Sequence, residues 1–188
     1  MRPARVAGKI AQIELSFRGT GDWRFLRVLR LYQETRTTAD ILERVHQYSR
    51  CIDGLILPKV SQTKRQFKSR TELFIGPRHH DLMGEIYDVR SAVEHLHENR
   101  YLGTFDRQVR LDLLKKEMIV EHIAQTSIAH VIEDPALWPH FENTMSLDAF
   151  WMLPVADRKA IWGEPIDPMM PLADFDPKFI TDADLGKT

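Results

Sequence analysis

The chain has 188 residues, of which 43% are hydrophobic and 28% charged, so we expect a folded domain rather than a disordered or fibrous chain. No apolar run approaches the roughly 18 residues that span a bilayer, and a single cysteine, Cys51, excludes an intramolecular disulfide. Because no continuous apolar segment follows the N-terminal residues, the sequence predicts a cytoplasmic protein without membrane contact.

The charges are unevenly distributed, although the formal net charge is only −1. Residues 1–36 hold eight Lys or Arg and three acids, whereas residues 164–188 hold six acids and two Lys. Four prolines in that last segment exclude a long helix. We therefore divide the chain into a basic N-terminal extension (1–36), a helical bundle (37–163) and an extended acidic tail (164–188), which is either disordered or lies on the surface.

The predicted elements begin with an ambiguous segment. The residues from Ile10 to Phe17 permit a strand, and those from Trp23 to Tyr32 permit a helix. Apolar residues three and four apart then predict four longer helices, at 38–57, 63–74, 79–99 and 106–133. Amphipathic helices bury their apolar faces only against one another, so the sequence predicts an all-α bundle.

Helix ends are predicted from capping residues and prolines. Thr37 with Asp40 resembles a capping box before the first helix, and Asp106 is the expected N-cap of the fourth. Two short helices should follow, one capped by Ser146 and one opened by Pro154.

The third predicted helix carries the strongest candidate for chemistry. It contains Arg90, Ser91, Glu94, His95 and His97, and this pattern resembles the R-x4-6-H motif of HEPN domains. The segments from Arg44 to Ile56 and from Phe67 to Gly76 look like the first two helices of that family, and the resemblance covers about residues 38–135.

The resemblance implies a HEPN-like bundle, a homodimer, and metal-independent cleavage of RNA by a toxin or antiviral defence effector. Arg90 would hold the phosphate, and His95 would be the general acid or base, with His97 as a secondary contact and Ser91 and Glu94 as orienting residues. On an ideal helix, however, Arg90 lies within about 20° of His97 and about 140° from His95, so geometry alone favours His97.

Two alternatives remain open. Arg90 and Glu94 are four residues apart, as in an ordinary surface ion pair, and the bundle would then be a catalytically inactive module that binds a protein partner or a nucleotide. The chain could also be part of a larger effector. We expect no metal or cofactor, because Glu94 and His97 form only one of the E-x-x-H motifs that a di-iron bundle needs.

A basic tract without acids precedes and enters the second predicted helix. RNA is the partner that this tract would bind, through phosphate contacts. Its candidate nucleic-acid-binding residues are Lys59, Lys64, Arg65, Lys68 and Arg70.

Overall fold

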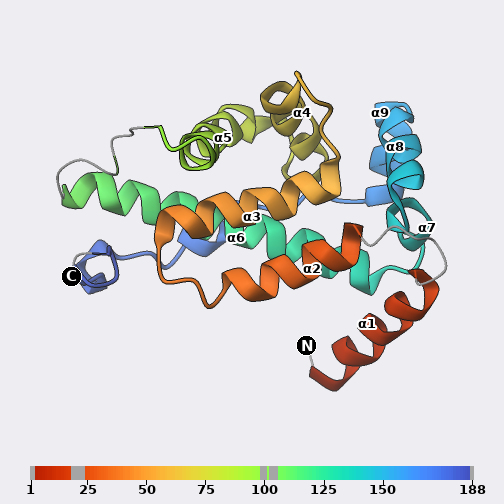
Figure 1. Ribbon diagram of the computed structural model, residues 1–188, viewed down its shortest axis with the longest axis horizontal. Coiled ribbons are helices and arrows are strands. Elements are labelled where there is room, and N and C mark those ends of the chain that lie inside the picture. Colours follow the sequence, from red (N-terminus) through yellow and green to blue (C-terminus); the bar gives the residue numbers. More distant parts are fainter. Residues whose placement is uncertain (1–2, 18–23, 98–100, 102–105, 187–188) are drawn as a thin grey trace.

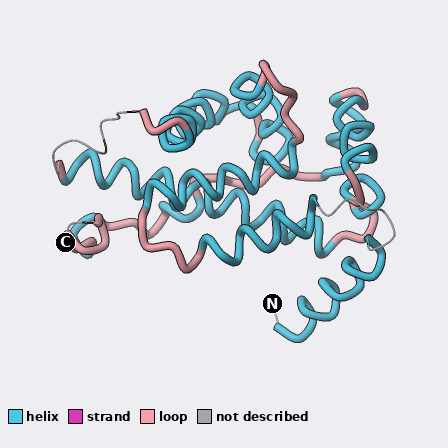
Figure 2. Tube along the Cα trace, in the orientation of Figure 1, coloured by secondary structure: helices cyan, strands magenta, loops and turns pink. Residues whose placement is uncertain are grey.

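Every regular element of the described residues is helical, and no strand occurs among them (Figures 1 and 2). The computed structural model describes residues 3–17, 24–97, 101 and 106–186. The predicted all-α class is confirmed, and no helix in the described ranges is long and apolar enough to cross a membrane. The α-helices are α1 (Pro3–Phe17), α2 (Arg24–Thr35), α3 (Ile41–Ile56), α4 (Thr63–Ile75), α5 (His80–Glu94), α6 (Arg107–Glu133), α7 (Trp138–Phe141), α8 (Thr144–Met152) and α9 (Val155–Trp162).

Helix α3 lies at the centre of the bundle and packs against α2, α5 and α6 (Figure 1). Its apolar residues Val45, Ile52 and Leu55 are completely buried, as the three- and four-residue spacing predicts. Helix α4 packs on α5, and α7 to α9 form one end of the molecule. Helices α3 and α5 therefore share a buried contact, and the residues along it come from distant parts of the sequence.

The capping residues fix where the long helices begin. The Asp40 carboxylate accepts the Glu43 N–H at 2.8 Å, so α3 begins at Ile41, and the predicted capping box at Thr37 is wrong. The Asp106 carboxylate accepts the Val109 N–H at 3.0 Å, which confirms the predicted N-cap of α6.

Of the two short helices, α8 begins at a different capping residue from the predicted one, and α9 has the predicted ends. Asn143, rather than Ser146, caps α8, because its side chain accepts the Ser146 N–H. Helix α9 lies between Pro154 and Gly163, as predicted.

The N-terminal segment is helical. The strand that the residues from Ile10 to Phe17 permit does not form, because Ile13 and Phe17, four residues apart, bury one face of α1. The helix permitted after them is confirmed as α2, although Trp23 lies outside the described residues. Phe25 and Val28 of α2 are buried in the same core as α3, so α2 is part of the bundle rather than an extension beside it.

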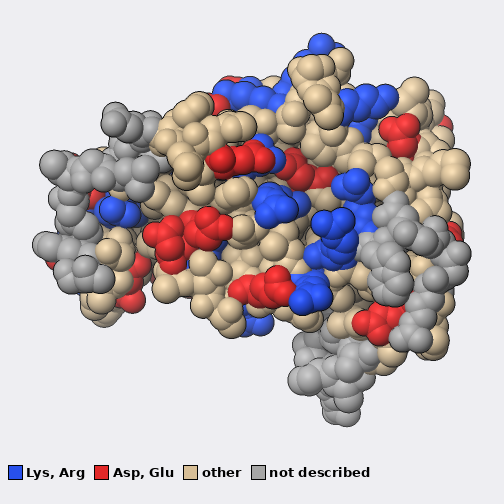
Figure 3. Space-filling view, in the orientation of Figure 1, with Lys and Arg blue, Asp and Glu red and all other residues tan. Residues whose placement is uncertain are grey.

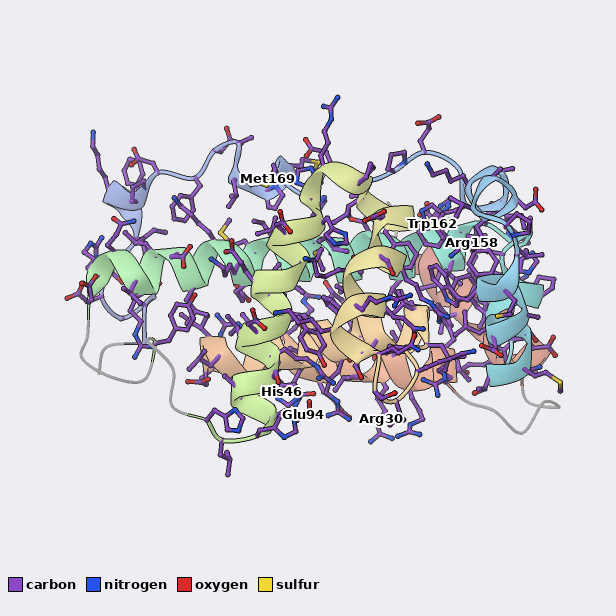
Figure 4. The ribbon with its side chains drawn as sticks, turned by 90° about the horizontal axis from the view of Figure 1, so that it is seen from above. Arg30, His46, Glu94, Arg158, Trp162 and Met169 are labelled. Carbon is purple, nitrogen blue, oxygen red and sulfur yellow. The ribbon has the colours of Figure 1, made fainter. Side chains whose placement is uncertain are left out.

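Several described residues of the acidic tail contact the bundle. The Ile166 N–H bonds to the Phe74 carbonyl at 2.6 Å, and Leu185 is completely buried. At the start of α6, Arg107 donates to the Asp182 carboxylate at 2.8 Å and to the Ile180 carbonyl at 2.6 Å. In Figure 4 the tail runs along the side of α6 that faces away from α3.

Candidate functional site

Arg90 lies where α5 packs against α3, and two carboxylates hold its guanidinium. Its Nη2 is 3.0 Å from the Asp53 carboxylate on α3, and its Nη1 is 2.7 Å from the Glu94 carboxylate one turn along α5. The guanidinium also lies 5.1 Å from the centre of the Tyr87 ring. Arg90 is only 9% exposed, so the candidate phosphate ligand is already paired within its own chain.

The carboxyl of Asp53 is a weaker acid than usual because the surrounding protein buries it. Burial raises its pKa to about 6, although the nearby Arg90 guanidinium opposes the shift and Glu94 adds to it. Desolvation disfavours the charged form of a carboxyl, and one cation at 3.0 Å does not offset that here. Asp53 therefore changes charge within about one pH unit of neutrality.

The end of α5 determines where the two histidines lie. The helix ends at Glu94, and Leu96 adopts a left-handed backbone with a φ of 55°. The His97 N–H then bonds to the Ala92 carbonyl at 2.9 Å, and the Leu96 N–H bonds to the Val93 carbonyl at 3.3 Å. This is the hydrogen-bond pattern of a Schellman C-cap, here without the usual glycine.

The C-cap corrects the ideal-helix expectation, because neither histidine belongs to the continuous helix. The predicted helix at 79–99 stops at Glu94, and residues 98 and 99 lie outside the described residues. The turn brings the His95 and His97 rings to a centroid distance of 5.6 Å, with 34° between their planes. Both side chains are exposed. The structure therefore brings His95 and His97 together, whereas ideal-helix geometry favours His97 alone.

The two predicted orienting residues have different surroundings. Ser91 is half-buried, and its backbone carbonyl accepts the His95 N–H at 3.1 Å. Glu94 is exposed and holds Arg90. Glu94 therefore contacts the candidate phosphate ligand, whereas the Ser91 contact involves only its backbone, and the orienting roles stay predictions.

His46 on α3 is a member of this region that the sequence pattern missed. Figure 4 shows it beside Glu94 at the C-terminal end of α5. Burial lowers the pKa of His46, and Arg50 and Arg90 lower it further, whereas Glu43 and Glu94 raise it. His46 and Asp53 are seven residues apart, so they share one face of α3. That spacing was visible in the sequence, but nothing in it showed that α5 packs on this face.

Several buried polar atoms at this junction have no hydrogen-bond partner among the described residues. They are Nδ1 of His46, Oδ1 of Asp53 and Nε of Arg90. Buried polar atoms are nearly always paired, with protein or with water, so a group of unpaired ones needs an explanation. The α3–α5 junction thus offers donors and acceptors that a bound polar group or water molecules can satisfy.

The basic tract lies on and before α4, away from the histidines along the chain. Lys64 is 2.6 Å from the Asp88 carboxylate and Lys68 is 3.1 Å from that of Asp81, so both lysines pair with acids of α5. Lys59 and Arg65 are exposed.

Arg70 does not lie on a phosphate-binding surface. It is buried, and it donates to the Ile56 and Leu57 carbonyls at 2.6 and 2.7 Å. It therefore stabilises the C-terminal end of α3, whose last carbonyls have no partner within the helix.

The arrangement at the end of α5 combines an arginine, a carboxyl that titrates near neutrality and two exposed imidazoles. These groups can hold an anion and transfer protons. No group of three or more His, Cys, Asp or Glu residues that could hold a metal ion occurs in the described ranges. Comparison with known proteins gives no assignment, because no family model, curated protein or solved structure significantly matches the chain.

Proposed function

We propose that the protein is a metal-independent endoribonuclease of the HEPN type, with His95 and His97 at its active site. The observation that carries the proposal is the pair of exposed imidazoles, 5.6 Å apart, directly after the helix that holds Arg90. Cleaving RNA without a metal requires one group to take the proton of the 2′-hydroxyl and another to protonate the leaving 5′-oxygen. Histidine titrates near neutral pH, so two imidazoles can share these steps.

In this mechanism His95 takes the proton of the 2′-hydroxyl as general base, and His95 of a second copy gives a proton to the leaving 5′-oxygen as general acid. His97 contacts the phosphate or orients it. The 2′-oxygen attacks phosphorus, the bond to the 5′-oxygen breaks, and a cyclic phosphate and a 5′-hydroxyl result. A hydrogen bond from an imidazole spans about 2.9 Å, so one phosphodiester that lies between the two rings can contact both of them.

Arg90 would stabilise the charge that develops on the phosphate oxygens. Its partner Glu94 is the more exposed of the two carboxylates, with 38% of its side chain open to solvent, so water can solvate Glu94 when it leaves Arg90. A phosphodiester can therefore replace Glu94 at modest cost while Asp53 continues to hold the other side of the guanidinium.

The proposal includes a homodimer formed through the end of α5. Leu96, between the two histidines, is 92% exposed and is held in a left-handed backbone conformation. A second copy packed there would cover this leucine and bring a second pair of histidines to the same place, as twofold symmetry allows. Such an enzyme would suit a toxin or antiviral defence effector.

A second candidate function is a catalytically inactive module that binds a protein or a nucleotide. The observation that favours it is the buried position of Arg90, whose two terminal nitrogens both pair with carboxylates. In this case the ion pairs join α3 to α5, and the histidines are surface residues.

Incubation of purified protein with mixed RNA in EDTA tests the two functions. The matched control is the His95→Ala/His97→Ala double variant, purified in the same way, because it reports any contaminating nuclease. Cleavage by the parent but not by the double variant supports the endoribonuclease. Equal cleavage by both proteins refutes the site, and no cleavage by either favours the binding module.

A further inference from the structure

Three exposed arginines lie on the face of the molecule that also carries the end of α5. Arg27 and Arg30 come from α2, and Arg50 comes from α3. Figure 3 shows Lys and Arg side chains over α2 and α3 on this face, with acidic side chains beside some of them and further acids toward the other end of the two helices. We call Arg27, Arg30 and Arg50 the arginine face.

The close crossing of α2 and α3 explains why Arg27 and Arg50 project to the same side. A Cβ on Gly54 would lie 2.1 Å from Cγ2 of Val28, and the Cys51 thiol lies 3.8 Å from the Val28 carbonyl oxygen. Val28 and Cys51 thus face each other across an antiparallel helix pair. In such a pair of right-handed helices, the residue before each facing residue points to the same side, and these residues are Arg27 and Arg50.

Arg50 connects this face to the site at α5. It lies four residues after His46 and three before Asp53, on the same side of α3. Its positive charge lowers the pKa of both His46 and Asp53, which places it within electrostatic range of both side chains. In Figure 4, Arg30, His46 and Glu94 lie along one edge of the molecule, the edge that faces the viewer in Figure 1.

The charge of the arginine face is only weakly neutralised. Arg30 pairs with Glu34 at 2.8 Å, but the two side chains are 80% and 60% exposed, so solvent screens the pair. Arg50 donates to the neutral amide oxygen of Gln47 at 3.1 Å. Phosphates that bind the arginine face would therefore release counterions.

We propose that the arginine face binds the backbone of single-stranded RNA and leads it to His95 and His97. Arg50 contacts the phosphate nearest the site, and Arg27 and Arg30 contact phosphates further along the strand. The strand is single because in-line attack by a 2′-oxygen needs a backbone free to leave the A-form geometry. The inference rests on the proposed endoribonuclease for its choice of polyanion, but it concerns binding, which is measured without cleavage.

The test measures binding of a fluorescent 2′-O-methyl RNA of about 16 nucleotides, a length suited to one binding surface. This RNA has no free 2′-hydroxyl and cannot be cleaved by the proposed route. The parent is compared with the triple variant Arg27→Gln/Arg30→Gln/Arg50→Gln. The control is Arg78→Gln/Lys159→Gln/Lys178→Gln, which removes the same charge from exposed positions outside α2 and α3.

The arginine-face variant should bind at least about tenfold more weakly at low salt, and its slope of log affinity against log salt should fall by about 2. The control should keep the parent slope. Equal weakening of both triple variants, or of neither, overturns the proposal. Circular dichroism checks folding, and the double variant Arg27→Gln/Arg30→Gln replaces the triple one if the latter unfolds.

Two further arms separate this inference from the proposed function. If the parent binds the methylated RNA through the arginine face but does not cleave unmodified RNA, the arginine face stands and the endoribonuclease falls. If the parent instead binds poly-glutamate and not RNA, and the triple variant loses that binding, an acidic polypeptide is the partner and the RNA proposal is wrong.

Discussion

The ion pair between Arg90 and Asp53 predicts how Arg90→Ala changes stability with pH. Burial raises the pKa of Asp53 to about 6 in the folded protein, against about 3.9 in an unfolded chain. The folded state therefore binds this proton more tightly than the unfolded state. Protonation of Asp53 therefore stabilises the folded state by about 3 kcal/mol below about pH 4. This stabilisation is lost as the pH rises through about 6.

Removing Arg90 raises the pKa of Asp53 further, because burial is then no longer opposed by the cation at 3.0 Å. Above about pH 6 Asp53 is ionised in the folded parent, so the parent loses no further stability as the pH rises. In the variant Asp53 still holds its proton when folded, so the free energy of unfolding continues to fall by about 1.4 kcal/mol per pH unit. At about pH 5 the variant should lose only the packing of the arginine stem and its contact with Tyr87, about 1–2 kcal/mol. At about pH 8 it should lose about 4 kcal/mol.

Urea unfolding followed by circular dichroism at about pH 5 and about pH 8 measures both values. The control is the same substitution made in Asp53→Asn, which has no carboxyl to titrate. In that background the difference between the two pH values should shrink to the part that His46 contributes, because Arg90 also lowers the pKa of His46. A loss in the parent background that does not change with pH, or a pH dependence of the same size in the Asp53→Asn background, would refute the assignment of Asp53 as the main buried titrating partner.

The other residues of the site give separate expectations. His95→Ala should lower RNA cleavage on the order of 10²–10⁴-fold and His97→Ala less, measured on gels in EDTA; the reverse order would assign the proton transfer to His97. Glu94→Gln should tighten binding of the methylated RNA, because Arg90 loses its weaker competitor for phosphate; unchanged affinity would separate Arg90 from RNA binding. Leu96→Gly should raise the free energy of unfolding of the monomer by up to about 1 kcal/mol, since it relieves a left-handed leucine; a loss in urea unfolding at a concentration too low for dimers would contradict this. Light scattering at micromolar concentration should give twice the mass of one chain, and a monomer mass would refute the dimer.

The long helices could be predicted because each buries one face and its apolar residues repeat accordingly. The end of α5 could not be predicted in this way, because Leu96 continues the apolar pattern that begins at Leu82. The backbone instead turns left-handed at Leu96, and this leucine is 92% exposed. A glycine or asparagine at that position would have indicated the turn. Because the helix ends at Glu94, the angles of an ideal helix do not apply to His95 and His97.

Only the contacts of the candidate site that lie within a single helix could be predicted from the sequence. The spacing of Arg90 and Glu94 indicates an i, i+4 ion pair, and that pair is present at 2.7 Å. The contact between Arg90 and Asp53 depends on how α5 crosses α3, which no local pattern encodes. The same crossing buries His46, and it makes Asp53 a titrating group rather than an ordinary surface acid.

The two carboxylates that hold Arg90 are not equivalent, and the difference decides whether a buried arginine can still bind phosphate. Asp53 is largely enclosed, so removing its cation leaves a buried charge that must take up a proton. Glu94 is 38% exposed at its side chain, so water can solvate it when it leaves Arg90. An incoming phosphodiester therefore meets a guanidinium that Asp53 keeps in place and Glu94 can release. Burial of Arg90 is thus compatible with catalysis as long as the exposed carboxylate, and not the buried one, is the group that RNA displaces.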